Sequence, residues 1–238
     1  EILPIMKEIE FGGKLVVVTG AASGMGLYAS KEFVRLGAKV IMCDVNEAML
    51  KAEAEAIGGA AVPMKGDVRD FGYAMEVAAE AEKLGGADCL VACAGGYEAR
   101  CLKRMVPFYE QPIEVIDWGL DVNLKGPVYF SRVLMPQMVA KRSGVIVILG
   151  SVTGFEGDGT GAMYGTAKSG LFNFVKGLAI AGAPHGVRAL CVTPGPVLSR
   201  AAMSGMPTLL GRAAELDELV DVILFMCSEN ASFITGSN

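Results

Sequence analysis

The chain has 238 residues, of which 52% are hydrophobic and 20% charged, a composition typical of a folded globular protein and not of a disordered one. Its formal net charge of −5 and its pI near 5.1 provide no basic surface, so we expect neither nucleic acid nor an anionic membrane as a partner. No apolar run approaches the roughly 18 residues of a membrane-spanning helix. The length suits a single domain, which we predict to span residues 1–238.

The cysteines lie mostly inside apolar runs and show neither C-x-x-C pairs nor the His/Cys spacing of a metal site. Buried, reduced thiols fit this pattern best, and they favour a reducing, cytoplasmic compartment and no bound metal. The six are Cys43, Cys89, Cys93, Cys101, Cys191 and Cys227.

In chain order, short apolar and β-branched runs alternate with longer stretches of helical period. The predicted strands are 14–20, 38–44, 88–95, 144–151 and 186–194, and the predicted helices are 25–36, 70–84, 112–139, 164–181 and 214–228. The acidic, alanine-rich stretch 46–59 has the composition of an exposed amphipathic helix. Strands that are apolar on both faces predict an α/β fold, a Rossmann-like doubly wound parallel sheet with helices on both faces.

A glycine-rich loop, "TGAASGMG", follows the first predicted strand and leads into a predicted helix. Gly20, Gly24 and Gly26 would let backbone N–H groups approach a pyrophosphate at the helix N-terminus. Asp44 ends the second strand, where a carboxylate accepts hydrogen bonds from the adenosine ribose of a dinucleotide and repels a 2′-phosphate. Loop and carboxylate together predict NAD binding, although glycines there could also serve only to sharpen a turn.

Tyr164 precedes Lys168 by one helical turn in "GAMYGTAKSG". Residues four apart share one face of a helix, so the phenol and the ammonium can converge on one point. Taken alone, such a pair could also belong to a solvated helix face.

With these motifs in order, the chain resembles the short-chain dehydrogenase/reductase family over nearly its whole length. The resemblance rests on "TGAASGMG", "GDV" at 66–68, "ACAGG" at 92–96, "DVNLKG" at 121–126, "LGSVTG" at 149–154, "YGTAK" at 164–168, "PGPVLS" at 194–199 and "ASFITG" at 231–236. Each motif is weak by itself, but the ordered set is specific.

The resemblance implies a catalytic unit of Asn123, Ser151, Tyr164 and Lys168. Tyr164 would exchange a proton with the substrate, and Lys168 would lower the pKa of the phenol, about 10 in free tyrosine, toward the working range and bind the nicotinamide ribose. Ser151 would polarise the substrate oxygen, and Asn123 would hold a water in a proton relay.

The resemblance also implies which residues contact the cofactor, NAD. They are Gly20, Ser23, Gly24, Met25, Gly26, Asp44, Asp67, Val68, Cys93, Ala94, Gly95, Tyr164, Lys168, Pro194, Gly195, Val197 and Ser199. A further implication is assembly into a homotetramer, or a homodimer, through two long helices.

Three features depart from the family pattern. Cys93 stands where the family usually has an asparagine, and we interpret it as a small buried replacement. The substrate lid after Ser199 is short, and the family's last strand does not follow "ASFITG". We therefore expect the gene product to be longer than this chain, which begins at Glu1, with a further strand after Asn238.

The sequence thus predicts an NAD-dependent oxidoreductase that transfers a hydride between nicotinamide and a secondary alcohol or ketone. The methionine-bearing lid, with Met203 and Met206, suits a hydroxysteroid or another hydrophobic cyclic alcohol. Two alternatives stay open at this point: an NADPH-dependent 3-ketoacyl reductase, and a non-catalytic nucleotide-sensing protein on the same fold.

Overall fold

The computed structural model describes residues 6–238. Six parallel strands form one sheet in the order β3-β2-β1-β4-β5-β6. Their bounds are β1 (Leu15–Thr19), β2 (Lys39–Asp44), β3 (Ala61–Lys65), β4 (Cys89–Ala92), β5 (Gly144–Leu149) and β6 (Val187–Val192). This strand order is that of the Rossmann fold, so the predicted fold class is confirmed.

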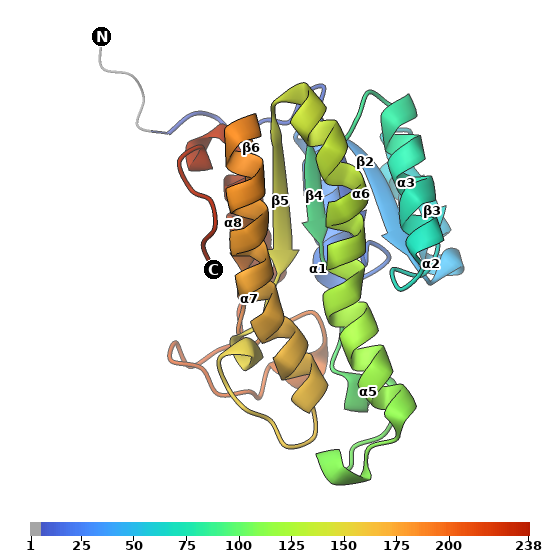
Figure 1. The fold of residues 1–238 in the computed structure, drawn as a ribbon, viewed down its shortest axis with the longest axis vertical. Helices are drawn as coiled ribbons and strands as arrows, with labels where there is room; N and C mark the ends of the chain where they lie inside the picture. Colours follow the sequence, from blue (N-terminus) through green and yellow to red (C-terminus); the bar gives the residue numbers. More distant parts are fainter. Residues whose placement is uncertain (1–5) are drawn as a thin grey trace.

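Helices cover both faces of the sheet. They are α1 (Gly24–Arg35), α2 (Glu47–Ile57), α3 (Phe71–Lys83), α4 (Glu98–Cys101), α5 (Ile113–Leu120), α6 (Gly126–Lys141), α7 (Ala162–Gly182) and α8 (Leu216–Cys227). In Figure 1, α3, α6 and α7 lie in front of the sheet. Within residues 6–238, no helix is both long and apolar enough to cross a bilayer.

Two hydrophobic cores lie on opposite faces of the sheet, because successive side chains of each strand point to opposite sides. Val17 of β1 packs in the core that includes Phe130 of α6, whereas Val16 and Val18 pack in the core that includes Phe33 of α1. Each of these side chains is fully buried. Burial on both faces explains why the strands are apolar throughout rather than alternating.

Two elements were not predicted from the sequence. β3 contains Pro63, which cannot donate a ladder hydrogen bond, and the strand is tolerated because it lies at the edge of the sheet. α4 spans only one turn. The predicted helix 112–139 is interrupted by a π-helical turn over residues 121–125, between α5 and α6, and such turns are frequent at functional sites.

The last described residues run along the outer edge of β6. The N–H of Gly236 donates to the carbonyl of Ala189 (2.8 Å), and the N–H of Cys191 donates to the carbonyl of Ser237 (2.9 Å). These bonds pair part of the strand edge that would otherwise be open.

The sheet has its topological switch point between β1 and β4, which are neighbours in space but not in sequence. The chain leaves β1 toward one side of the sheet and leaves β4 toward the other, so their loops separate and leave a crevice at the carboxyl ends of the strands. Ligands of doubly wound folds bind in such crevices.

Candidate active site

A cleft of about 1920 Å³ opens at the carboxyl ends of the strands. It is lined by the loops that follow all six strands and by the first turns of α1 and α7. Every residue predicted to bind the cofactor lines this cleft, and so do Ser151, Tyr164 and Lys168. Asn123 is the one predicted site residue that does not line it.

The glycine loop fits closely against the loop after β4. Gly20 has φ of +69°, and a Cβ there would lie 2.9 Å from the Cα of Ala94, while a Cβ on Gly26 would collide with the carbonyl of Gly20. α1 begins directly after this loop, its N-cap Ser23 makes no side-chain capping bond, and its first turn carries no acidic residue. The helix N-terminus therefore lies at the cleft with no carboxylate in its own first turn, an arrangement that suits a phosphate group.

The Asp44 carboxylate is held in place at the end of β2. One oxygen accepts from the N–H of Ala22 (3.0 Å) and the other from the N–H of Asn46 (2.9 Å). Each carboxylate oxygen has capacity for a further hydrogen bond. Asp44 is thus a pre-positioned acceptor beside the glycine loop.

Asp67 and Arg69 form a bidentate ion pair on the same side of the cleft. The Arg69 guanidinium donates through Nη2 at 2.7 Å and through Nε at 3.0 Å to one Asp67 oxygen, and these hydrogen bonds lower the pKa of Asp67. Val68 lines the cleft between them. The charge of Arg69, an arginine of the same cleft lining as Asp44, is therefore already compensated.

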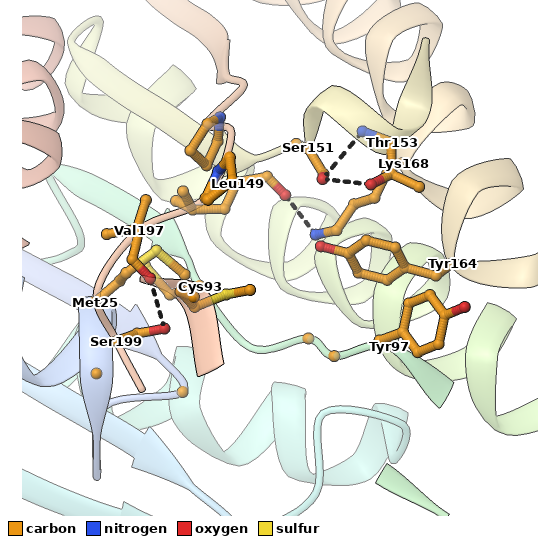
Figure 2. Close-up of a pocket in the computed structure, with 18 of the residues that line it drawn as sticks. Met25, Cys93, Tyr97, Leu149, Ser151, Thr153, Tyr164, Lys168, Val197 and Ser199 are labelled. Carbon is orange, nitrogen blue, oxygen red and sulfur yellow. Dashed lines mark hydrogen bonds between the residues drawn. The ribbon is translucent and has the colours of Figure 1, made fainter. Parts of the chain in front are cut away.

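The Ser151, Tyr164 and Lys168 side chains point toward one another, as Figure 2 shows. Ser151 follows β5, whereas the other two lie on the first turns of α7. The Lys168 Nζ lies 5.6 Å from the centre of the Tyr164 ring and donates to the carbonyl of Leu149 at 2.5 Å. The convergence of the phenol and the ammonium on one point agrees with their four-residue spacing.

Burial shifts the pKa values of both Tyr164 and Lys168. Contrary to the lowering expected from Lys168, burial raises the pKa of Tyr164, while the Ser151 hydroxyl and the charge of Arg100 oppose the rise. Burial lowers the pKa of Lys168 to about 8, because the charged form of an amine is penalised away from water. Lys168 is 4% exposed, so its ammonium acts within a poorly solvated site.

Asn123 lies one layer behind the cleft, in the π-helical turn. Its side-chain oxygen accepts from the N–H of Gly96 (2.8 Å), and its amide donates to the carbonyls of Gly96 and Gly119 (both 2.9 Å). The side chain is fully buried. Asn123 thus fixes the loop after β4. This loop lies close to Lys168, since a Cβ on Gly95 would be 3.5 Å from the Lys168 Nζ.

Cys93 lines the cleft as a partly buried thiol. Burial raises its pKa to about 12, so the reactive thiolate is disfavoured at neutral pH. The loop is tied to its neighbour by another group, since the N–H of Ala94 donates to the hydroxyl of Thr19 (3.1 Å).

Glu98 is a site residue that the sequence did not indicate. It is 2% exposed, and its two oxygens accept from the backbone N–H groups of Met163 and Tyr164, each at 3.1 Å. Gly161, the residue at the N-cap of α7, has no side chain to cap the helix. Glu98 therefore caps the helix that carries Tyr164 and Lys168.

We expect Glu98→Gln to destabilise the fold by about 1–3 kcal/mol, because the amide has one acceptor oxygen and leaves a buried N–H without a partner. Turnover should fall with it, while NAD affinity changes little. Urea unfolding measures the stability, and steady-state kinetics measures the turnover. The control is Glu114→Gln, because Glu114 is exposed. A Glu98→Gln variant as stable as the control would contradict the capping role.

The outer part of the cleft is lined by Met105, Trp118 and the segment after β6, including Met203 and Met206. Met203 and Met206 thus line the cleft and belong to neither hydrophobic core. Trp118 also packs against the core, so it serves both packing and the cleft wall. Within residues 6–238, no group of three or more His, Cys, Asp or Glu side chains is arranged to hold a metal ion.

Comparison with known proteins connects this geometry to a family. The short chain dehydrogenase family matches residues 14–208. The meso-2,3-butanediol dehydrogenase of Serratia marcescens is 35% identical over 97% of this chain and 93% of its own length. The 2-dehydro-3-deoxy-L-rhamnonate dehydrogenase (NAD(+)) of a Sphingomonas species is 32% identical over 95% of this chain and 93% of its own length.

The 3-oxoacyl-[acyl-carrier-protein] reductase FabG of Thermotoga maritima is 33% identical over 94% of both chains. Among solved structures, that of gox2181 superimposes with a TM-score of 0.88 at 28% identity, over 98% of this chain and 96% of the other. The similarity therefore extends along the whole cleft-forming domain.

Proposed function

This chain belongs to the short-chain dehydrogenase family and is an oxidoreductase of alcohols or ketones, and we propose that it transfers a hydride between NAD and a secondary alcohol or ketone. The observation that carries the proposal is the meeting of Ser151, Tyr164 and Lys168 in the cleft that also holds the glycine loop and Asp44. Proton transfer and dinucleotide binding are thereby combined in one site.

The cleft fits a dinucleotide. The crowding of Gly20 and Gly26 leaves backbone N–H groups, and no side chains, against the place for a pyrophosphate. Asp44 would accept from the adenosine ribose, and Lys168 would donate to the nicotinamide ribose. NAD, when bound, supplies the carbon that accepts or returns the hydride.

Tyr164 acts as the general base in alcohol oxidation and as the general acid in ketone reduction. Its oxygen takes the hydroxyl proton of the alcohol, while Ser151 donates a hydrogen bond to the same substrate oxygen. Lys168 favours the phenolate through its charge. Asn123 holds Gly96, and so keeps the loop opposite Lys168 in place.

An apolar cyclic alcohol, such as a hydroxysteroid, is the substrate class that the outer cleft favours. Trp118, Met105, Met203 and Met206 give that part apolar walls. A panel of secondary alcohols and hydroxysteroids with NAD, followed by the absorbance of reduced nicotinamide, tests the proposal. Failure of every alcohol to produce the reduced form would reject it.

The FabG relative makes an NADPH-dependent ketoacyl reductase the second candidate. A 2′-phosphate would face Asp44, and Arg69, a cation of the same cleft lining, is paired with Asp67. Lys39 begins β2, at the end opposite Asp44, and does not line the cleft. The convergence of Ser151 with the phenol and the ammonium argues against the other alternative, a non-catalytic sensor.

We expect at least about a tenfold preference for NAD over NADP in kcat/KM, because charge-assisted hydrogen bonds to a ribose contribute about 1.5–3 kcal/mol. The double change Asp44→Ala with Val45→Arg should shift the preference toward NADP. Val45 is 64% exposed and lines the cleft, so an arginine there can reach the phosphate without disturbing the core.

Steady-state kinetics with both cofactors measures this preference, and Met49→Arg, on the exposed surface of α2, is the control for an added charge. Equal efficiencies in the unmodified protein, or a preference for NADP, would overturn the role given to Asp44.

A further inference from the structure

Two arginines of the cleft lining are not used by the proposed mechanism. Arg100 belongs to α4, and Arg200 lies in the segment after β6. Both line the same cleft as Tyr164. Within residues 6–238, neither forms an ion pair with a carboxylate, whereas Arg69 and Arg212 of the same lining do.

Arg100 lies beside Gly96, in the loop after β4. A Cβ on Gly96 would be 3.8 Å from the Arg100 Nη2 and 3.6 Å from the Trp118 ring. The backbone of Gly96 is bonded to Asn123, and the next residue, Tyr97, has its ring centre 5.9 Å from that of Tyr164. The guanidinium therefore stands beside an aromatic wall of the substrate end.

The acidic side chains near the arginines are bonded to other groups or exposed to solvent. Glu98 accepts two N–H groups of α7, and Asp158 accepts from the N–H of Gly161 (2.6 Å) and the hydroxyl of Tyr97 (2.7 Å). Glu156, which also lines the cleft, is exposed to solvent. Among residues 6–238, no carboxylate is thus bonded to either arginine.

The charges of the two arginines influence the pKa values of neighbouring groups. Burial raises the pKa of Tyr164, and Arg100 opposes this rise. Burial also raises the pKa of Cys101, and there both Arg100 and Arg200 act in the opposite direction. Arg100 also donates through Nη2 to the Cys101 sulfur at 3.4 Å, and both arginines line the cleft that contains Tyr164.

We propose, building on the function given above, that the substrate carries an anionic group beyond its reacting carbon and that Arg100 and Arg200 bind this group. A guanidinium presents paired donors that match the two oxygens of a carboxylate or a phosphate. The apolar part of the substrate would pack against Trp118 and Met203. The substrate class is an apolar hydroxy or oxo acid, or its phosphate counterpart.

Binding can be measured without turnover, because Trp118 is the single tryptophan of the chain and lines the cleft. In the Tyr164→Phe background with NAD, 4-hydroxycyclohexanecarboxylate, its methyl ester and the monophosphate of cyclohexane-1,4-diol are titrated while tryptophan fluorescence is followed. The acid or the phosphate should bind at least about tenfold more tightly than the ester. The better of the two identifies the anionic group.

Arg100→Met and Arg200→Met should each remove most of that difference and leave the affinity for the ester within about threefold. Arg104→Met, a change outside the cleft lining on the same segment, is the matched control. Equal affinities for the charged probes and the ester, or a difference that both variants retain, would overturn the proposal. NAD binding and turnover of uncharged alcohols by the unmodified protein test the proposed function separately.

Discussion

We expect Tyr164→Phe to lower kcat by about a hundredfold to ten-thousandfold, since removing one positioned acid–base group commonly has this effect. The phenylalanine ring retains the packing against Tyr97, so NAD affinity stays nearly unchanged. Steady-state kinetics gives kcat, and calorimetric titration with NAD gives the affinity.

Tyr109→Phe is the matched control, because Tyr109 is 82% exposed and does not line the cleft. It should leave both quantities unchanged. A Tyr164→Phe enzyme with activity within about tenfold of the unmodified protein would reject Tyr164 as the acid–base group.

Lys168→Met should lower kcat by about a hundredfold or more and also weaken NAD binding by about tenfold, because one ammonium serves both the phenol and the ribose. Lys176→Met, on an exposed position of the same helix, is the control. If kcat fell while NAD affinity stayed the same, the ribose role would be wrong.

The pH dependence of the reaction follows from Tyr164. Burial raises the pKa of this phenol, and alcohol oxidation needs the unprotonated form. The kcat/KM for oxidation should therefore rise from neutral toward alkaline pH, and that for ketone reduction should fall. In Lys168→Met the rise should move to higher pH, since the phenolate loses a stabilising charge. A profile that is the same in both proteins would contradict the coupling of the two groups.

The fold could be predicted because the pattern that indicates each strand or helix lies within a short stretch of sequence. Strands apolar on both faces indicate a parallel sheet between helices, and the carboxyl ends of such strands meet at one edge. Residues that end or follow different strands, such as Gly20, Asp44 and Ser151, were therefore expected in one cleft. β3 escaped prediction because Pro63 and partial exposure weaken its strand pattern.

The parts of the site that were missed depend on contacts between distant segments. Glu98 and Met163 are 65 residues apart in the sequence, and nothing around Glu98 marks it as a helix cap. The placement of Arg100 beside Gly96 and Trp118 likewise arises only when α4 packs against α5. Assembly into a tetramer and a cytoplasmic location stay predictions, because the fold of one chain decides neither.

Hydride transfer from the substrate to the cofactor is the central claim, and isotope tracing tests it most directly. A secondary alcohol that the enzyme oxidises is prepared with deuterium on its carbinol carbon, and the reduced nicotinamide is examined by mass spectrometry and NMR. The account predicts that the deuterium appears at nicotinamide C4 and that none enters from heavy-water solvent when the unlabelled alcohol is used. Loss of the label to water, or label taken from the solvent, would contradict direct transfer in this cleft.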